Sequence, residues 1–278
     1  MSDRNEKAWK DEVRNYRDKL EVSENSWTPA KYKEFLDNRW QRYVEDPDHE
    51  TMQLATRQTL ENNKVFERWT AYKGSSALII TAVNHPNAEL REELWLSPAL
   101  AEFAGSIQAD DKCKVIFHVL EEGKHSLWDV LPVILCDILG SDYELFKEHK
   151  RSLSNSFSGF NPQSGRENWF HGENGHLANP VKELLTAWVA KYPDRTLFVI
   201  VDKLDRCLPR GSTEEKDALR RALKFFVTLT WDSRGKLKFL FLAVHNAHWP
   251  KWDFGDLNDT RDPNRLLWYL EWRQGECI

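Results

Sequence analysis

The chain has 278 residues, of which 41% are apolar and 30% charged, and its 44 acidic and 39 basic side chains give a formal net charge of −5. A chain of this length can bury a large core in one or two domains. It contains no run of about 18 uncharged apolar residues, which excludes a membrane-spanning helix. Nucleic-acid backbones are bound by clustered Lys and Arg in excess, so the mild acidity argues against a dedicated nucleic-acid binder.

The N-terminus and the cysteines indicate a cytoplasmic protein. The first ten residues, MSDRNEKAWK, have neither the apolar core of a secretion signal nor the Arg-rich, acid-poor pattern of a transit peptide. The cysteines lie far apart and form no C-x-x-C pair, so we expect reduced thiols rather than a zinc site or a disulfide scaffold. They are Cys113, Cys136, Cys207 and Cys277.

The beginning of the chain is predicted to be helical. Apolar side chains recur at helical spacing over residues 9–20 and again over residues 32–44. Thr28 and Pro29 supply an N-cap and a favourable first position for the second of these helices. A third helix is expected over residues 48–69.

Four short runs rich in β-branched and aromatic residues follow, at residues 76–83, 114–120, 196–202 and 238–244. They are almost continuously apolar, which is typical of strands covered on both faces, as in a parallel sheet. Amphipathic helical patterns separate them, and right-handed crossovers then give a three-layer α/β sandwich with a mainly parallel sheet. The last apolar run, residues 265–272, fits either a fifth strand or a closing helix. This change of pattern divides the chain into a helical prefix, residues 1–70, and an α/β domain, residues 71–278.

The third apolar run ends in an acidic motif. Residues 197–207 read LFVIVDKLDRC, so the strand closes on Asp202, and Asp205 follows three positions later. Ligands of open parallel sheets bind at the carboxyl ends of the strands, which makes this pair a candidate catalytic and metal-binding site. An apolar strand that ends in Asp and is followed by a second acid resembles the Walker B element of P-loop NTPases. The alternative is that both acids only cap a turn before the next helix.

The order of the elements extends this resemblance. The chain has a helical prefix, a first strand SALIITAV, a second strand KVIFHVL followed by an apolar helix, the strand ending in DKLDRC, and a fourth strand KFLFLAV. Over residues 65–270 it resembles the core of the STAND class of P-loop NTPases, in particular the NACHT-like modules of filamentous fungi. The resemblance implies that Asp202 holds Mg2+ through water and that Asp205 polarises the attacking water, with ATP or GTP as the nucleotide.

The connection after the first strand departs from this family. A P-loop requires G-x-x-x-x-G-K-[ST] there, because glycines let backbone N–H groups approach the phosphates and Lys binds the outer phosphates. Residues 83–100 instead read VNHPNAELREELWLSPAL, with neither Gly nor Lys. Pro98, at the start of the next helix, also removes one of the free amide donors that would face an anion. These losses together predict that ordinary ATP binding is abolished.

We therefore expect a degenerate P-loop domain that acts as a non-hydrolysing regulatory or protein-interaction module and needs no cofactor. Its partner is expected to be a protein, because aromatic residues are enriched at binding hot spots. Candidate contact surfaces are the helical prefix and the tryptophans of the C-terminal segment, for which core packing is the competing role. These are Trp249, Trp252, Trp268 and Trp272.

Two enzymatic alternatives remain open. In the first, the chain is an active Mg2+-dependent NTPase with ATP or GTP as ligand, in which Asn84 and His85 contact the phosphates in place of the missing loop. Asp202 then binds Mg2+, and Asp205 orients water. In the second, the chain is an α/β enzyme unrelated to NTPases with its site at the same strand ends. The residues that would surround its pocket are His85, Asp202, His245 and His248.

Overall fold

The computed structural model describes residues 3–22, 27–44, 55–83, 95–120, 126–157, 176–208, 210–232, 235–244 and 267–273. The prefix contains α1 (Asp3–Lys19), α2 (Pro29–Val44), α3 (Arg57–Glu61) and α4 (Lys64–Ala71). The strands are β1 (Ser76–Val83), β2 (Cys113–Val119), β3 (Thr196–Asp202), β4 (Lys236–Val244) and β5 (Leu267–Arg273). The later helices are α5 (Ser97–Gln108), α6 (Val130–Ser141), α7 (Tyr143–Phe157), α9 (Ala178–Lys191) and α10 (Thr213–Asp232), with short 3-10 turns at Leu127–Asp129 and Leu204–Cys207. None of the described helices is both long and apolar enough to cross a membrane.

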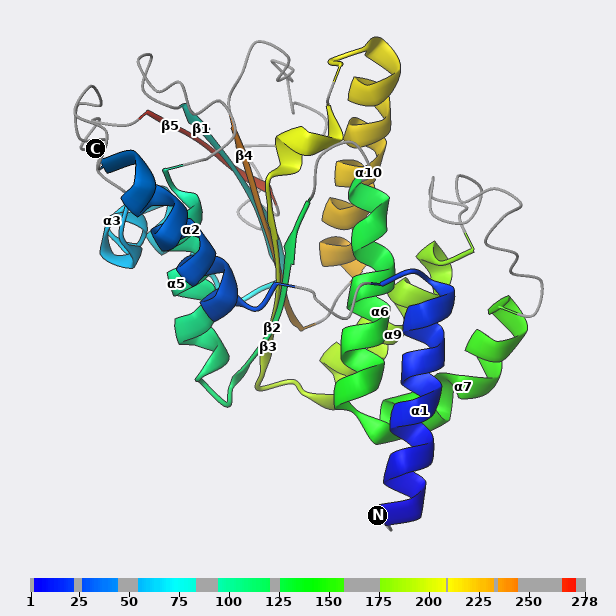
Figure 1. Ribbon diagram of the computed structural model, residues 1–278. Coiled ribbons are helices and arrows are strands. Elements are labelled where there is room, and N and C mark those ends of the chain that lie inside the picture. Colours follow the sequence, from blue (N-terminus) through cyan, green and yellow to red (C-terminus); the bar gives the residue numbers. More distant parts are fainter. Residues whose placement is uncertain are drawn as a thin grey trace.

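The strands form one parallel sheet in the order β2-β3-β4-β1-β5. From β2 to β5 the chain moves across the sheet in one direction, through β3 and β4. The connection from β1 to β2 runs in the opposite direction. Right-handed crossovers therefore place α5 on one face and the later helices on the other. Figure 1 shows this arrangement, with α2, α3 and α5 on one face and α6, α9 and α10 on the opposite face. The predicted three-layer α/β sandwich is confirmed, and the last apolar run forms a strand, β5.

One predicted element is wrong. The third prefix helix does not run continuously to residue 69, because the described part of that stretch contains two short helices, α3 and α4. The break falls at Asn63, whose side chain accepts hydrogen bonds from the N–H groups of Val65 at 2.9 Å and Phe66 at 3.2 Å. An Asn side chain that bonds the backbone in this way starts a new helix rather than continuing the old one.

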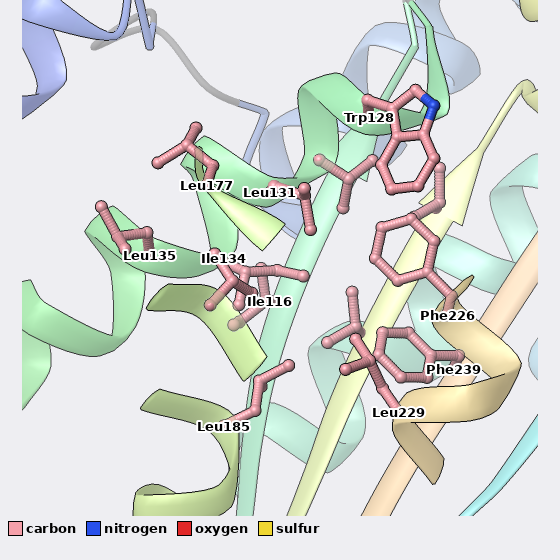
Figure 2. Packing of buried hydrophobic residues seen from close by; sticks show 14 of the residues in the cluster. Ile116, Trp128, Leu131, Ile134, Leu135, Leu177, Leu185, Phe226, Leu229 and Phe239 are labelled. Atoms are coloured by element: carbon pink, nitrogen blue, oxygen red, sulfur yellow. The ribbon is translucent and has the colours of Figure 1, made fainter. Parts of the chain in front are cut away.

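Alternation along each strand divides the core into two clusters, one on each face of the sheet. On β3, Val199 belongs to the cluster formed with α6, α9 and α10, whereas its neighbour Phe198 belongs to the cluster formed with α2 and α5. Figure 2 shows the first cluster, in which Trp128, Phe226 and Phe239 pack beside aliphatic side chains. The ring centroids of Phe226 and Phe239 are 5.2 Å apart. Burial of both faces explains why the strands are almost continuously apolar.

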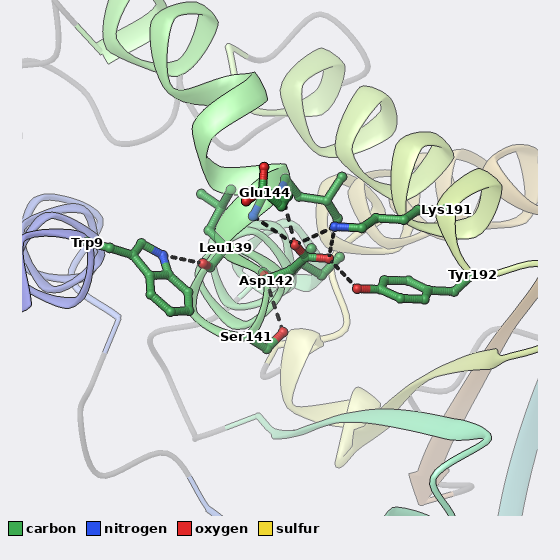
Figure 3. Close-up of polar contacts among 9 residues, drawn as sticks. Trp9, Leu139, Ser141, Asp142, Glu144, Lys191 and Tyr192 are labelled. Carbon is green, nitrogen blue, oxygen red and sulfur yellow. Dashed lines mark hydrogen bonds and ion pairs between the residues drawn. The ribbon is translucent and has the colours of Figure 1, made fainter. Parts of the chain in front are cut away.

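The prefix helices pack on both faces of the sandwich. α1 lies beside α6, where the indole N–H of Trp9 donates to the carbonyl of Leu139 at 2.9 Å (Figure 3). α2 packs on α5 on the opposite face, where Tyr32 and Leu36 join the core. The division of the chain at residue 70 stays a prediction.

The junction between α6, α7 and α9 is organised by one carboxylate, Asp142, shown in Figure 3. Its Oδ1 accepts hydrogen bonds from the N–H groups of Glu144 and Leu145, both at 3.1 Å, and so caps the start of α7. Lys191 Nζ and the Tyr192 hydroxyl, at the end of α9, donate to the same carboxylate at 2.7 Å each. Burial raises the pKa of Asp142, but the hydrogen bonds from Lys191 and Tyr192 outweigh burial and lower it overall.

The described cysteines are free thiols, and their reduced state in the cell stays a prediction. Cys113 and Cys207 are half-buried and Cys136 is buried, and Cys277 lies outside the described residues. Burial raises the pKa of Cys136 to about 12 and also raises that of Cys207, so neither thiol is readily ionised at neutral pH.

A buried lysine, Lys238, ties β4 to α4. Its Nζ donates to the carbonyls of Trp69 at 2.5 Å and Tyr72 at 2.7 Å, at the C-terminal end of α4. The ammonium also lies 5.2 Å from the centroid of each of those two rings. The helix end and the aromatic faces favour the charged form, but burial lowers the pKa of Lys238 to about 7.

We expect the wild type to gain stability relative to Lys238→Met as the pH rises. The folded state holds its proton less tightly than the unfolded chain, so the cost of burying the ammonium is complete below about pH 7 and disappears toward the ordinary pKa of about 10.4. Urea denaturation between about pH 6 and pH 9.5 measures this change, whose slope is at most about 1.4 kcal/mol per pH unit. Lys236→Met, at the half-buried start of the same strand, is the control. A difference that stays constant with pH contradicts this account of Lys238.

Candidate functional site

The candidate site lies where the carboxyl ends of β3, β4 and β1 meet at one edge of the sheet. The connections that leave β1 and β3 run to opposite faces, toward α5 and α10, and ligand crevices form where connections diverge in this way. Asp202 ends β3, Asp205 lies in the 3-10 turn that follows, and Ser97 begins α5. The other predicted site residues lie outside the described residues, so the structure does not place them. They are Asn84, His85, His245 and His248.

Asp202 is completely buried, and donors of the chain itself bind its carboxyl group. The Tyr32 hydroxyl donates to Oδ2 at 2.8 Å, and the backbone N–H of Lys203 donates to Oδ1 at 2.7 Å. Tyr32 comes from α2, 170 positions earlier in the chain. Its ring packs against those of Trp27 and Phe117, at centroid distances of 5.4 and 5.7 Å. The acid therefore anchors the prefix to the end of β3.

Burial raises the pKa of Asp202. The charge and N–H of Lys203 and the hydroxyls of Ser97 and Tyr32 act in the opposite direction without reversing the shift. Lys203 itself has a left-handed backbone, with φ 62° and ψ 42°. That conformation costs a residue with a Cβ atom about 1–2 kcal/mol, and strain of this kind persists where surrounding contacts enforce it, often at functional sites. The turn after β3 is therefore held in a specific, strained shape.

Asp205 joins the ends of β3 and β4. Its Oδ1 accepts a hydrogen bond at 2.9 Å from the N–H of Val244, the last residue of β4. Its carbonyl accepts another at 2.9 Å from Leu208. Burial raises the pKa of Asp205, while the hydrogen bond from Val244 lowers it. These contacts give Asp205 a structural role, and its catalytic role stays a prediction.

Sequence reasoning misses two members of this site, Ser97 and Tyr32. Ser97 is completely buried at the first position of α5, and its hydroxyl lies close enough to Asp202 to lower the pKa of that acid. Even so, Ser97 Oγ makes no hydrogen bond of good geometry to any residue that the structure describes. The P-loop pattern places Ser or Thr at this helix start, but the missing Gly and Lys conceal that signal. For Tyr32, the sequence indicates only a helix position that faces the core.

The available donors suit a divalent cation, the ligand that the resemblance implies. The Asp202 carboxylate and the Ser97 hydroxyl are hard oxygen donors, and Mg2+ is commonly held by one or two carboxylates with water and phosphate oxygens completing its shell. Within the described ranges, no cluster of three or more His, Cys, Asp or Glu side chains could hold a metal ion. Mg2+ at Asp202 would therefore depend on water or phosphate oxygens, and α2 would have to uncover the carboxyl group.

Comparison with protein-family models and with curated proteins found no match. Two solved structures of the ORC2 protein of Aeropyrum pernix, one described as ADPNP-ADP complexes and one as the ADP form, match with 14% and 13% identity and a TM-score of 0.37 each. The alignments cover 84% of this chain and 51% and 52% of theirs, so the chain spans about half the length of the solved chains it matches. At this TM-score the likeness carries no argument. The fold class rests on the sheet itself, whose five parallel strands and two helical layers are consistent with a P-loop NTPase-like sandwich.

We expect Asp202→Asn to gain stability relative to the wild type as the pH rises from about 3 to about 7. A raised pKa means that folding favours the protonated acid, so this contribution is complete below the unfolded pKa of about 3.9 and is lost as the pH rises through the folded pKa. Asn has the same shape and does not titrate. Urea denaturation across this range measures the trend, with Asp217→Asn on the exposed face of α10 as the control. Relative stability that falls with pH would show that the structure favours the ionised acid.

Replacement of Asp205 by Ala should lower the free energy of unfolding by about 1–3 kcal/mol, because the Val244 N–H loses its acceptor. Asp205→Asn keeps an acceptor oxygen and should recover most of that loss. Chemical denaturation of the two variants provides the comparison. Equal losses in both contradict a role for Asp205 in joining the strand ends.

Proposed function

We propose that this protein is a degenerate P-loop domain, similar to the STAND and NACHT-like modules of filamentous fungi, and that it works in the cytoplasm as a non-hydrolysing regulatory or protein-interaction module. One observation carries the proposal: Asp202 is fully buried, and both of its carboxyl oxygens accept hydrogen bonds from Tyr32 and Lys203. A carboxylate that serves hydrated Mg2+ must be reachable by water or phosphate. In this arrangement the acid stabilises the fold instead.

The connection between β1 and α5 supports the same proposal. It contains no Gly to bring backbone N–H groups to a phosphate and no Lys to bind one. Glu89, Glu92 and Glu93 add negative charge to this connection. Repulsion of phosphate adds to the lost hydrogen bonds, each of which is worth about 1.5–3 kcal/mol when charge-assisted.

The proposed partner is a protein that contacts the prefix. Among the C-terminal tryptophans, Trp272 is buried and packs edge-on against Trp95 with ring centroids 5.7 Å apart, so it serves the core. Trp268 is half-buried, and Trp249 and Trp252 lie outside the described residues. The prefix is favoured over the C-terminal segment because α1 has a broad exposed face, whereas the described part of that segment is mostly packed against β1.

An active Mg2+-dependent NTPase is the second candidate, and Ser97 is the observation that favours it. Its buried hydroxyl lies beside Asp202 at the start of the helix that follows β1, where the P-loop pattern has its Mg2+-binding Ser or Thr. Asp202 would then hold Mg2+ and Asp205 would orient water, with Asn84 and His85 at the phosphates of ATP or GTP. The unrelated α/β enzyme stays a prediction, because His85, His245 and His248 lie outside the described residues.

The proposal predicts that the purified chain shows no Mg2+-dependent thermal shift with millimolar ATP, GTP or ADP. A ligand that binds only the folded state adds about 2.7 kcal/mol at a hundredfold excess over its Kd, which corresponds to several degrees for a domain of this size. Thermal unfolding with and without each nucleotide and Mg2+ therefore decides the point.

Stoichiometric, Mg2+-dependent nucleotide binding that Asp202→Ala removes would overturn the proposal. Phosphate release would then separate a binding protein from an enzyme. Release above that of an Asp202→Asn, Asp205→Asn double variant supports the NTPase, and release equal to that control excludes it.

A further inference from the structure

We propose that α2 is an internal cover of the Asp202 site, in which Tyr32 competes with a divalent cation for the Asp202 carboxyl group. This inference rests on the proposed function, because it treats the carboxyl edge of the sheet as the remnant of a cation and phosphate site. It concerns the regulation of that site by the prefix of the same chain.

The competition follows from the contacts of the carboxyl group. The Tyr32 hydroxyl donates to Oδ2, and the ring beneath it is 1% exposed, so α2 both occupies and seals the acid. A carboxylate has about four lone-pair directions, and the short bond from the Lys203 N–H uses one of those on Oδ1. That backbone bond can persist when a cation binds. Tyr32 is therefore the group that has to leave.

α2 is docked through a narrow stripe. Among its described side chains, only Pro29, Tyr32 and Leu36 are buried, and they lie at the helical spacing of one face. All of its other described side chains are exposed or half-buried, and the Lys33–Asp37 ion pair lies within α2 itself. Among the described side chains of α2, release would therefore uncover mainly Tyr32 and Leu36, together with half-buried Phe35.

The group beneath the cover is suited to a cation. Ser97 Oγ is buried and makes no hydrogen bond of good geometry to a described residue, although it lies close enough to Asp202 to lower the pKa of that acid. With Tyr32 displaced, a hydroxyl and a carboxylate would face the same space, and both are donors that Mg2+ and Mn2+ accept. The two states, covered and cation-bound, then exclude each other.

Thermodynamic linkage gives this cover a regulatory consequence. If cation binding displaces α2, then whatever binds and displaces α2 must strengthen cation binding by the same factor. A protein partner that captures α2 would thus open the Asp202 site. Regulation would then depend on the position of α2 and on the hydrogen bond of the Tyr32 hydroxyl.

Binding of Mn2+, followed by the loss of its free electron paramagnetic resonance signal, tests the competition in the full-length chain. We expect Tyr32→Phe to bind Mn2+ about tenfold more tightly than the wild type, because one charge-assisted hydrogen bond no longer opposes the cation. Tyr16→Phe is the matched control, since Tyr16 is a buried tyrosine of α1 whose hydroxyl pairs with the Ser154 hydroxyl instead of a carboxyl group. Adding Asp202→Asn to Tyr32→Phe should abolish the gain.

Equal Mn2+ affinity in Tyr32→Phe and the wild type overturns the proposal, as does a gain that survives Asp202→Asn. The absence of saturable binding in both proteins also overturns it. These outcomes are independent of the nucleotide test, because a wild type that binds Mg2+ and ATP contradicts the proposed function whatever Tyr32 does.

Hydrogen exchange in the wild type gives a second measurement that needs no variant. At Mg2+ concentrations above the measured Kd, the amides of residues 30–44 in α2 should exchange faster, while those of residues 3–19 in α1 stay unchanged. Unchanged or slower exchange in α2 under cation saturation contradicts displacement of the helix.

Discussion

One buried hydrogen bond, from the Tyr32 hydroxyl to the Asp202 carboxyl group, connects the main features of this protein. It joins a prefix helix to the carboxyl end of an internal strand, and α2, which carries Tyr32, packs on α5 on one face of the sheet. A carboxylate without partners at this depth would cost several kcal/mol, so the hydroxyl and the Lys203 N–H are what allow an acid to be buried there. The same contact that stabilises the acid keeps it from water and ligands.

Much of the fold could be predicted from local patterns. Near-continuous apolar runs predict strands covered on both faces, and the helical spacing between them predicts a parallel sandwich. The last strand stays ambiguous in the sequence, because the short apolar run of residues 265–272 fits a helix or a strand until β1 supplies a partner. The break before α4 depends on one side chain, Asn63, whose hydrogen bonds to Val65 and Phe66 override the helical periodicity. The strand order depends on contacts between distant segments and has no local signal.

The candidate site also contains residues that the sequence predicts and residues that only the fold reveals. Asp202 can be found from the sequence because an apolar strand that stops at an acid is a local pattern. Ser97 follows a connection whose Gly and Lys are missing, so its place beside Asp202 becomes visible only when β1 and β3 are assembled in one sheet. Tyr32 lies 170 positions from its partner, and no spacing rule joins them. The roles of Asn84 and His85 remain predictions.

The central claim is that Tyr32 and Asp202 stabilise the fold through each other, and a double-mutant cycle tests it most directly. Urea denaturation of the wild type, Tyr32→Phe, Asp202→Leu and the double variant gives the coupling free energy between the two side chains. The account predicts a coupling of about 1–3 kcal/mol, as for a buried hydrogen bond to a polar or charged group. Additive losses, within about 0.5 kcal/mol, would contradict it, because they would mean that the two side chains stabilise the protein independently.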